Sequence, residues 1–477
     1  MAPKPALVWL RDDLRLADNP ALVAGCRDAA ERRAPLVIVY TLDQISEGIR
    51  PLGGAARWWL HHSLAALSQS LADKGQVLIL RHGPAEDVIP ALVAETGAES
   101  LFWNRRYGGG ERAVDAALKA RLKAADVRVE SFQANLLFEP WIVRTKAGDP
   151  FRVYTPFWKA CRELGPPRAP LNAPSDMPPP IDGLASDALD DWSLLPTKPD
   201  WAAGLRDTWH PGEASAHERL ATFVTSRLQR YAAERDQPAA EASSRLSPHL
   251  RFGEVSPFQL WQRVAPELPG IDLADIDKFR SEIGWREFSW HLLFHQPDLA
   301  TRNFQPRFDA FPWPPVDDVA LSAWQQGRTG IPIIDAGMRE LWQTGWMHNR
   351  VRMIVASFLV KNLLVDWRIG EAWFWDTLVD ADPANNPASW QWVAGSGADA
   401  APYFRIFNPV LQGEKFDPDG RYVRRHVPEL ASLPDKLIHA PWKAGGAPGY
   451  PAPVVDLAAT RERALAAFGH MRADDLD

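Results

Sequence analysis

The stretch ALVWLRDDLRLADNPALVAGCRDAAERRAPLVIVY, residues 6–40, decides the fold of the first part of the chain. It opens and closes on continuous apolar runs, Ala6–Leu10 and Leu36–Tyr40, which are typical of parallel strands buried on both faces. Three similar runs follow at Val77–Leu80, Leu101–Trp103 and Val127–Phe132. Amphipathic stretches such as Ala55–Lys74 and Glu111–Ala124 separate the runs, so the sequence predicts a doubly wound α/β domain with a parallel sheet.

The domain organisation changes after about residue 131. From there to about Pro211 the periodicity fades and prolines accumulate, and PPRAPLNAPSDMPPP, residues 166–180, cannot be helical. From about Ala214 onward almost every segment has the pattern of a helix ended by Pro or Gly. We therefore expect an α/β domain over residues 1–131, a linker over 132–213 and an all-helical domain over 214–477, in keeping with the length of the chain.

The composition is typical of a soluble globular protein, with 46% hydrophobic and 24% charged residues. No apolar run reaches the roughly 18 residues that span a bilayer, and the N-terminus has no apolar signal region. Cys26 and Cys161 lie far apart and outside metal-ligand spacing. We therefore expect a cytoplasmic protein with two reduced thiols, no metal site and no membrane segment.

Two global features bear on the kind of partner. The net charge of −7 argues weakly against nucleic acid, although a local basic face would be sufficient for binding. The chain holds 22 Trp and only 7 Tyr, and 13 of the Trp lie from Trp261 onward. This inventory is consistent with a Trp-rich helical core, with stacking on a ring system, or with electron transfer between indoles.

A short polar motif, Ser243-Ser244-Arg245-Leu246-Ser247-Pro248, precedes an apolar stretch in the helical part. Hydroxyl groups, backbone N–H groups at a helix start and one Arg together would make a cradle for a diphosphate. The alternative is an ordinary helix cap with a solvated Arg.

The segment WMHNRVRMIVASFLVK, residues 346–361, groups polar side chains on one face of a predicted helix. Asn349, Arg352 and Met353 fall at i, i+3 and i+4, hence on the same face. A buried Arg needs a carboxylate partner, and Asp380 and Asp382 are the candidates.

Two further pairs place a polar group beside an indole. Asn386 and Trp390 are four residues apart and share a helix face, whereas Trp392 would point elsewhere. Glu282 and Trp285 form an i, i+3 pair, which could present a hydrogen-bonding group next to a stacking platform. The alternative for each pair is a surface polar group and a core indole.

Five segments resemble the photolyase/cryptochrome family in order and spacing. They are WLRDDLRLADNPAL (9–22), SSRLSPHLRFGEVSP (243–257), GWREFSWHLLFH (284–295), GRTGIPIIDAGMRELWQTGWMHNRVRMIVASFLVK (327–361) and DADPANNPASWQWVAGSGADAAPYFRIFNPVLQGEKFDP (380–418). The resemblance runs over nearly the whole chain and is greatest to bacterial cyclobutane pyrimidine dimer photolyases of class I or class III. It implies an α/β antenna domain and a helical domain that holds FAD in a U shape.

The resemblance also implies which residues bind FAD. Arg352 and Asp380 would form a salt bridge beside the isoalloxazine, Asp382 would bind the same ring system, and Asn386 would face flavin N5. The full expected set is Tyr231, Ser243, Ser244, Arg245, Leu246, Ser247, Phe279, Glu282, Arg286, Asn349, Arg352, Asp380, Ala381, Asp382 and Asn386. Phe279 departs from the family pattern, since many relatives have Trp at this position.

By the same resemblance, the substrate is DNA that contains cyclobutane pyrimidine dimers. Glu282, Asn349, Met353 and Asn386 are the expected catalytic residues. The expected DNA contacts are Arg235, Glu282, Trp285, Arg286, Asn349, Arg350, Met353, Trp392, Arg405 and Lys415. The implied reaction is light-driven: reduced FAD gives an electron to a dimer flipped out of the duplex, and the cyclobutane ring splits. A desolvated Glu282 would remain protonated and stabilise the radical anion.

Two accessory systems are also implied. Trp390, Trp367 and Trp313 match the indole chain that reduces the flavin from the surface, and Trp342 offers a second route. An antenna chromophore, 5,10-methenyltetrahydrofolate, would sit between the domains against Asn104, Tyr107 and Glu111. Gly110 stands where pterin-binding relatives often have Asn, so 8-hydroxy-deazaflavin is the alternative.

The main rival function is that of a cryptochrome, a blue-light receptor that signals without repairing DNA. Asn386 favours repair, because Asp or Cys opposite N5 marks the receptor branches. A (6-4) photolyase would show a His pair where this chain has Met347-His348-Asn349. An ordinary flavin oxidoreductase would need a dinucleotide fingerprint, and the first strand is followed by none. We expect a repair enzyme that acts as a monomer.

Overall fold

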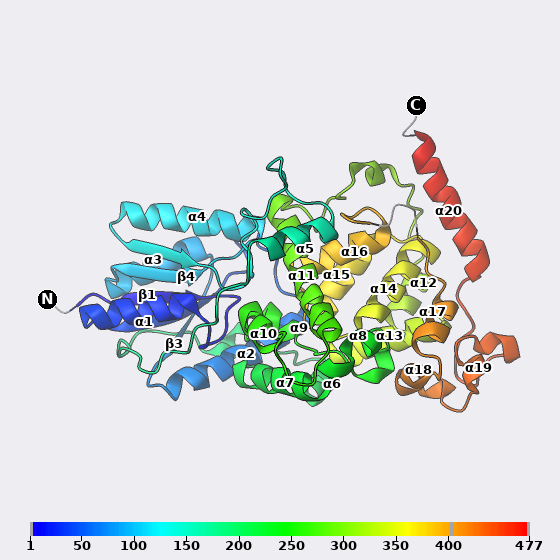
Figure 1. Ribbon diagram of the computed structural model, residues 1–477, viewed down its shortest axis with the longest axis horizontal. Helices are drawn as coiled ribbons and strands as arrows, with labels where there is room; N and C mark the ends of the chain where they lie inside the picture. The colour runs from blue at the N-terminus through cyan, green and yellow to red at the C-terminus, as the bar shows by residue number, and fades with distance from the viewer. Residues whose placement is uncertain (1–2, 401–404, 475–477) are drawn as a thin grey trace.

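The computed structural model describes residues 3–400 and 405–474, which form an α/β domain followed by a helical domain (Figure 1). All five strands of the first domain are parallel, in the order β3-β2-β1-β4-β5. Their bounds are β1 Ala6–Leu10, β2 Leu36–Leu42, β3 Leu78–His82, β4 Ser100–Asn104 and β5 Arg128–Phe132. The predicted doubly wound sheet is therefore confirmed, with strand ends shifted by at most two residues.

Helices cover both faces of this sheet. Their bounds are α1 Pro20–Arg32, α2 Gly54–Ala72, α3 Ala85–Thr96 and α4 Gly109–Ala124. Val8 and Ile38 belong to the core that includes α1 and α2, whereas their neighbours Leu7 and Val37 belong to the core that includes α3 and α4. This alternation follows from the two-residue period of a strand, and it explains why the strand sequences are apolar throughout.

The predicted linker is attached to the α/β domain along much of its length. The proline-rich stretch has no helix, as expected, and it runs along the sheet: Leu36 N–H donates to Pro179 O, and Asp187 N–H donates to Leu80 O. The segment also contains helices that the sequence pattern did not indicate, α5 Tyr154–Glu163, η1 Leu189–Trp192 and α6 Ala203–Thr208. The α5 helix packs against α11 of the helical domain, so the linker joins both domains.

The remainder of the described chain is helical, as predicted. Its α-helices are α7 Glu213–Ser226, α8 Tyr231–Glu234, α9 Ser247–Arg251, α10 Pro257–Arg263, α11 Leu273–His295, α12 Asp318–Gln325, α13 Pro332–Thr344, α14 Asn349–Ser357, α15 Trp367–Thr377, α16 Asn385–Ala394, α17 Pro409–Phe416, α18 Arg421–His426, α19 Asp435–Ile438 and α20 Leu457–Asp474. Short turns of other types are η2 Leu228–Arg230, η3 Pro238–Ala240, η4 Pro306–Ala310, η5 Phe358–Asn362, η6 Pro428–Leu430 and η7 Pro441–Ala444.

The helix predicted over residues 346–361 begins later and changes type before its end. Trp346 precedes α14, and His348 caps the helix by accepting a hydrogen bond from Arg350 N–H. Burial lowers the pKa of His348 to about 4, which keeps the ring neutral and able to accept. The last part of the segment is η5, a π-helical turn next to which α20 packs. π-helical turns often occur at functional sites.

Within the described residues, no helix combines the length and the apolar character that crossing a membrane requires.

Candidate flavin and substrate site

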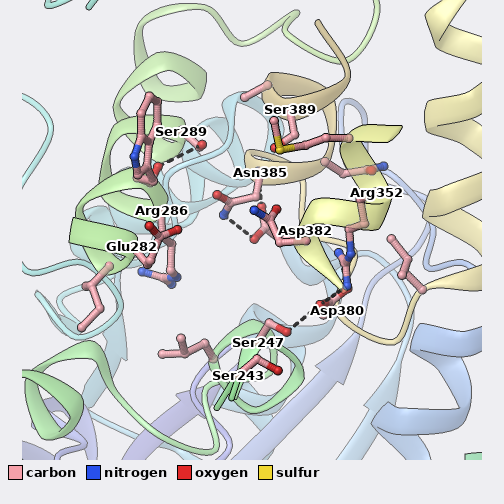
Figure 2. Close-up of a pocket in the computed structure, with 18 of the residues that line it drawn as sticks. Ser243, Ser247, Glu282, Arg286, Ser289, Arg352, Asp380, Asp382, Asn385 and Ser389 are labelled. Atoms are coloured by element: carbon pink, nitrogen blue, oxygen red, sulfur yellow. Dashed lines mark hydrogen bonds and ion pairs between the residues drawn. The ribbon is translucent and has the colours of Figure 1, made fainter. Parts of the chain in front are cut away.

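A cavity of about 560 Å³ lies inside the helical domain, a volume usual for a cofactor or ligand site. Side chains of α11, α14 and α16 line it, together with the loop before α9 and the segment between α15 and α16. Every residue that the sequence analysis assigns to FAD lines this one cavity. Segments separated by more than 100 residues therefore form one site, which Figure 2 shows from the cavity side.

An ion pair at the cavity wall confirms the predicted partner of the α14 guanidinium. Arg352 donates from both terminal nitrogens to Asp380, with N–O distances of 3.1 and 2.8 Å (Figure 2). Ser247 Oγ donates to the same carboxylate at 2.6 Å. Two-point pairing fixes the plane of the guanidinium, so Arg352 presents a fixed cationic edge to whatever fills the cavity.

Asp382 is held by groups at the start of α16. Its carboxylate accepts hydrogen bonds from the backbone N–H groups of Ala384 and Asn385, at 2.8 and 2.5 Å, and from the Asn385 side chain at 2.6 Å (Figure 2). These contacts orient the carboxylate at the cavity wall and agree with the predicted role of Asp382 as a polar contact for a ring system.

The serine-rich motif forms a loop, and the expected helix start is largely absent. Ser243, Ser244 and Leu246 precede α9, which has only five residues and so offers little helix dipole. Arg245 has a left-handed backbone, with φ of 51°, and its guanidinium lies 4.8 Å from the centre of the Trp346 ring. The cradle for an anion is therefore a turn with hydroxyl groups and a guanidinium beside it.

Glu282 is paired with two cations at the cavity wall. Arg235 contacts its Oε1 directly, and Lys278 Nζ lies 3.1 Å from the same atom. Burial lowers the pKa of Arg235, but the neighbouring Glu282, Tyr231 and Asp236 together outweigh this effect and the net direction is upward. That a desolvated Glu282 is protonated stays a prediction.

Two indoles form walls of the cavity above Glu282. Trp285 stacks on Tyr154 with ring centres 3.7 Å apart and an angle of 10°. Trp392 donates from Nε1 to the Asp399 carbonyl at 3.1 Å, and it lines the cavity together with Asn386 and Trp390. Although the spacing places Trp392 on another face of α16 than Asn386 and Trp390, all three side chains line the same cavity.

The predicted DNA contacts divide into two groups. Asn349, Arg350 and Met353 line the cavity from α14. Arg235 and Arg286 line it from other segments, although the Arg235 side chain is only 10% exposed. Arg405 and Lys415 are exposed and lie outside the cavity.

Lys415 lies close to the cavity mouth nevertheless. Its Nζ and the Arg350 guanidinium both lie over the Phe416 ring, at 5.1 and 4.5 Å from its centre. Arg350 also pairs with Asp236 at 2.7 Å. The basic residues at this mouth are thus partly neutralised by acidic neighbours.

The three indoles expected to carry electrons differ in burial, from Trp390 at the cavity to the half-buried Trp313. Trp390 lines the cavity and is packed so tightly on α15 that Gly370 has no room for a side chain. Trp367, three residues before Gly370, is buried and donates to Asn303 at 2.9 Å. Trp313 is half-buried and packs on Phe311, with ring centres 4.3 Å apart.

The expected antenna residues do not act together. The Asn104 amide lies inside the α/β domain, where it donates to Asp13 and Asn19 and accepts from Ala21 N–H. With 2% exposure it has no surface left for a chromophore, so its assignment to an antenna site is wrong. Tyr107 and Glu111 lie at the start of α4, facing the helical domain: Tyr107 has the Trp290 ring of α11 as a neighbour.

Several cavity residues were not identified from the sequence. They are Asp236, Arg251, Lys278, Ser289, Asn385 and Ser389. Ser289 follows Trp285 by one helical turn, so its place on the same face of α11 could have been predicted from the spacing. Arg251 lies three residues after the serine-rich motif, and it pairs with Asp12 of the α/β domain, which no local pattern could indicate.

Comparisons with known proteins agree with this geometry. Residues 6–176 match the DNA photolyase family, and residues 279–470 match the FAD binding domain of DNA photolyase. A deoxyribodipyrimidine photo-lyase of Agrobacterium fabrum is 53% identical, and the alignment covers 98% of both chains. Cryptochrome-1 of Arabidopsis thaliana is 37% identical over 98% of this chain and 70% of its own.

A solved structure supports the same assignment. The bacterial class III photolyase from Agrobacterium tumefaciens superimposes with a TM-score of 0.94 at 52% identity, covering 99% of this chain and 98% of the other. Sequence, cavity and fold thus agree over both domains, and this chain belongs to the photolyase/cryptochrome family.

Proposed function

We propose that this protein is a deoxyribodipyrimidine photo-lyase, which repairs cyclobutane pyrimidine dimers in DNA by light-driven electron transfer from FAD. The main support for the proposal is that the residues assigned to FAD line the same cavity as the polar and indole side chains assigned to the lesion. We call the part with these polar and indole side chains the mouth of the cavity. All five of Glu282, Trp285, Trp392, Arg352 and Asp380 line this cavity; in the proposal the first three form the mouth that receives the lesion, and Arg352 with Asp380 forms the part that holds the flavin. Similarity to photo-lyases over nearly the whole chain supports the same reaction.

The residues present fit FAD. Ser243, Ser247 and Arg245 surround a turn suited to the diphosphate, while Arg352 and Asp382 offer polar edges for the isoalloxazine. Phe279, Tyr231 and Trp390 supply apolar surface on other sides. Bound reduced FAD supplies the electron on excitation, and these residues set its position and surroundings.

The mouth suits a dinucleotide that has left the base stack. Unstacking costs a few kcal/mol and is cheapest where the duplex is already distorted, so damage is selected partly by its own instability. The face of Trp285 not covered by Tyr154, together with Trp392, bounds an apolar slot for two saturated rings. Arg350, Lys415 and Arg405 contact the flanking phosphates, which positions the duplex without reading its sequence.

Glu282 is the polar anchor of the lesion in this proposal. Without DNA its carboxylate is shared by Arg235 and Lys278. On binding, the thymine N–H groups replace one of these cations, and the remaining cation lies where negative charge develops on the substrate. Asn349 and Met353 complete the same wall from α14.

The test uses purified protein and an oligonucleotide with a single thymine dimer. We expect stoichiometric, non-covalent FAD and loss of the dimer only under blue or near-ultraviolet light after reduction. Binding of FAD without any repair of a saturating, dimer-containing oligonucleotide would reject the proposal in favour of a receptor function.

A cryptochrome function is the second candidate, because Cryptochrome-1 of Arabidopsis thaliana is similar over 98% of this chain. Asn386 opposite the flavin and a complete lesion mouth favour repair over signalling. A receptor would retain FAD photochemistry and lose dimer affinity, so a binding assay in the dark separates the two functions.

We also propose an antenna chromophore at the seam between α4 and α11, probed first as 5,10-methenyltetrahydrofolate. Tyr107 lies next to the rings of Trp141 and Trp290, and Trp141 is 40% exposed. The Tyr107 hydroxyl and the Glu139 carboxyl hydrogen-bond each other, whereas Trp290 Nε1, buried in the same seam, has no hydrogen-bond partner among the described residues. An unsatisfied buried N–H near an exposed indole supports a ring ligand with a polar edge.

Mass spectrometry of the released chromophores tests this antenna, with an 8-hydroxy-deazaflavin as the alternative outcome. We propose that the enzyme acts as a monomer on DNA, which light scattering with and without a dimer-containing duplex checks.

A further inference from the structure

A chain of three side chains connects the α/β domain to the wall of the cavity. Arg50, in the loop between β2 and α2, donates from both terminal nitrogens to Glu371 on α15, with N–O distances of 2.7 and 2.9 Å. Asn386 on α16 donates from Nδ2 to Glu371 Oε1 at 2.8 Å and to the Glu371 carbonyl at 3.0 Å. One carboxylate is therefore shared between a guanidinium of one domain and a cavity amide of the other.

The burial of Glu371 makes Arg50 necessary. Its side chain is 3% exposed, and a buried carboxylate is costly unless it is paired and hydrogen-bonded. Arg50 is itself held in place: its guanidinium lies 4.1 Å from the centre of the Trp375 ring, and Trp375 Nε1 donates to Pro51 O at 2.9 Å. The pair is therefore a preorganised, two-point contact.

This pairing fixes which end of the Asn386 amide faces the cavity. A side-chain amide has a donor end and an acceptor end, and its orientation follows from the surrounding hydrogen bonds. Glu371 offers only acceptor oxygens when ionised, so Nδ2 must point toward it. The acceptor Oδ1 is then the end left for a ligand in the cavity that Asn386 lines.

We propose that Arg50 is a positioning residue for the flavin chemistry: through Glu371 it holds the Asn386 oxygen toward flavin N5. The inference rests on the proposed function, in which Asn386 faces N5. Reduced flavin carries a hydrogen on N5 and oxidised flavin does not, so a fixed acceptor favours the reduced form. The α/β domain thereby contributes to the midpoint potential of a cofactor bound in the helical domain.

The experiment measures the midpoint potential of bound FAD and the rate at which reduced FAD reoxidises in air. Arg50→Met should shift the potential downward and speed reoxidation about three- to tenfold, the effect of weakening one hydrogen bond. Glu371→Gln should act in the same direction with a smaller shift, because the side chain then no longer excludes the flipped Asn386 amide while the residue 371 carbonyl still accepts from Nδ2. Arg50→Lys, which keeps the charge, should restore most of the wild-type behaviour.

A matched control lies on the same seam between the domains. Asp376 on α15 accepts a hydrogen bond from Gly54 N–H at 2.8 Å and does not contact Asn386. Asp376→Ala should leave the potential unchanged at equal FAD content. If Asp376→Ala shifted the midpoint potential as much as Arg50→Met does, the proposal would be overturned. Any weakening of the contact between the domains would then be enough to change the potential.

Asn386→Ala separates this inference from the proposed function. If that variant leaves the potential unchanged, flavin N5 is elsewhere and the proposed placement fails. If it shifts the potential while Arg50→Met and Glu371→Gln do not, the placement stands and the role of Arg50 is wrong.

Discussion

Single polar side chains at the cavity mouth owe their state to neighbours that are distant in sequence. Glu282 and Trp285 line one cavity as the i, i+3 spacing predicts, but the cations that contact Glu282 are Arg235, 47 residues away, and Lys278. A helical pattern identifies the face on which a carboxyl lies. It does not identify the cation that reaches the carboxyl from another segment.

Glu282→Ala should lower the repair yield per absorbed photon much more than it lowers FAD content. The variant leaves the polar edge of the thymines without a partner in a desolvated slot, which costs about 1–3 kcal/mol of lesion affinity. It also removes the group that orients charge around the developing anion. The measurement counts repaired dimers per photon with the variant saturated by dimer-containing oligonucleotide.

Lys278→Met is the matched control, because it removes one cation of the cluster and keeps the carboxyl. It should retain the repair yield within about twofold, which corresponds to a small fraction of the free energy of one hydrogen bond. A wild-type yield from saturated Glu282→Ala would mean that Glu282 only binds the lesion.

Glu287 offers a test of electrostatics away from the chemistry. Burial raises its pKa to about 7, against 4.5 for an unperturbed Glu. The folded state therefore binds the proton more tightly than the unfolded chain does. The stability that this proton gives is present below pH 4.5 and is lost as the pH rises through about 7, a change of about 3 kcal/mol.

Glu287→Gln should therefore raise the free energy of unfolding at about pH 8 and change it little at about pH 5. Glutamine can still accept the hydrogen bond from Phe138 N–H, which now reaches Glu287 Oε2 at 3.2 Å. Urea unfolding of both proteins at the two pH values gives the comparison. If the two proteins differed in unfolding free energy by the same amount at both pH values, the Glu287 carboxyl would not be the titrating group.

At the scale of elements, periodic patterns predicted which side chains of α14 and α16 share a face. The faces carrying Asn349, Arg352 and Met353, and Asn386 with Trp390, do line one cavity, because a regular helix converts spacing directly into direction. The short α9 and the π-helical η5 were not predictable in the same way. A one-turn helix and a π-turn depend on packing against other elements, which leaves no local period.

The predicted indole chain implies that photoreduction of the flavin can be lost while DNA repair is kept. Trp390→Phe should block light-driven reduction of oxidised FAD, since Trp390 is the indole of the predicted chain that lines the cavity. Repair by enzyme that has been reduced chemically should persist, because the chain only charges the cofactor. Flavin absorbance under steady blue light, followed by a dimer assay, measures both properties.

A second group of indoles defines the result that would contradict this route. Trp342 on α13 stacks on Trp373 of α15 with ring centres 6.2 Å apart, and Trp342 is 54% exposed. Wild-type photoreduction in Trp390→Phe, abolished only when Trp342→Phe is added, would place the main electron route there. Trp342→Phe alone is the control and should photoreduce normally.

At the scale of the whole molecule, the two domains are joined through buried polar contacts as well as apolar packing. Arg50 with Glu371 and Arg251 with Asp12 cross from one domain to the other. The parallel sheet and the helical nature of the second domain could be predicted, because they depend on local periodicity. The contacts across the seam could not, since they join residues 321 and 239 positions apart and obey no spacing rule.

The densest part of this seam surrounds Trp59, and it yields the last prediction. Trp59, on α2 of the α/β domain, is fully buried and lies edge-on to Trp209 and His249, with ring centres 5.4 and 5.1 Å away. Its Nε1 donates at 3.1 Å to Glu254, which also accepts from Gly212 N–H and bonds His249. The indole therefore completes a buried network whose other members belong to the linker and the helical domain.

Trp59→Phe should lower the free energy of unfolding by about 2 kcal/mol, through lost volume and one lost hydrogen bond. The variant should also weaken the coupling of the domains, because the removed contacts are interdomain contacts. Trp58→Phe is the matched control: Trp58 is equally buried on the same helix, but its ring packs on Trp59 and His62 of α2 itself. Urea unfolding is followed by circular dichroism and by flavin release. The two signals should coincide in wild type and Trp58→Phe and separate in Trp59→Phe, whereas coincident signals in all three proteins would show that the loss of Trp59 does not uncouple the domains.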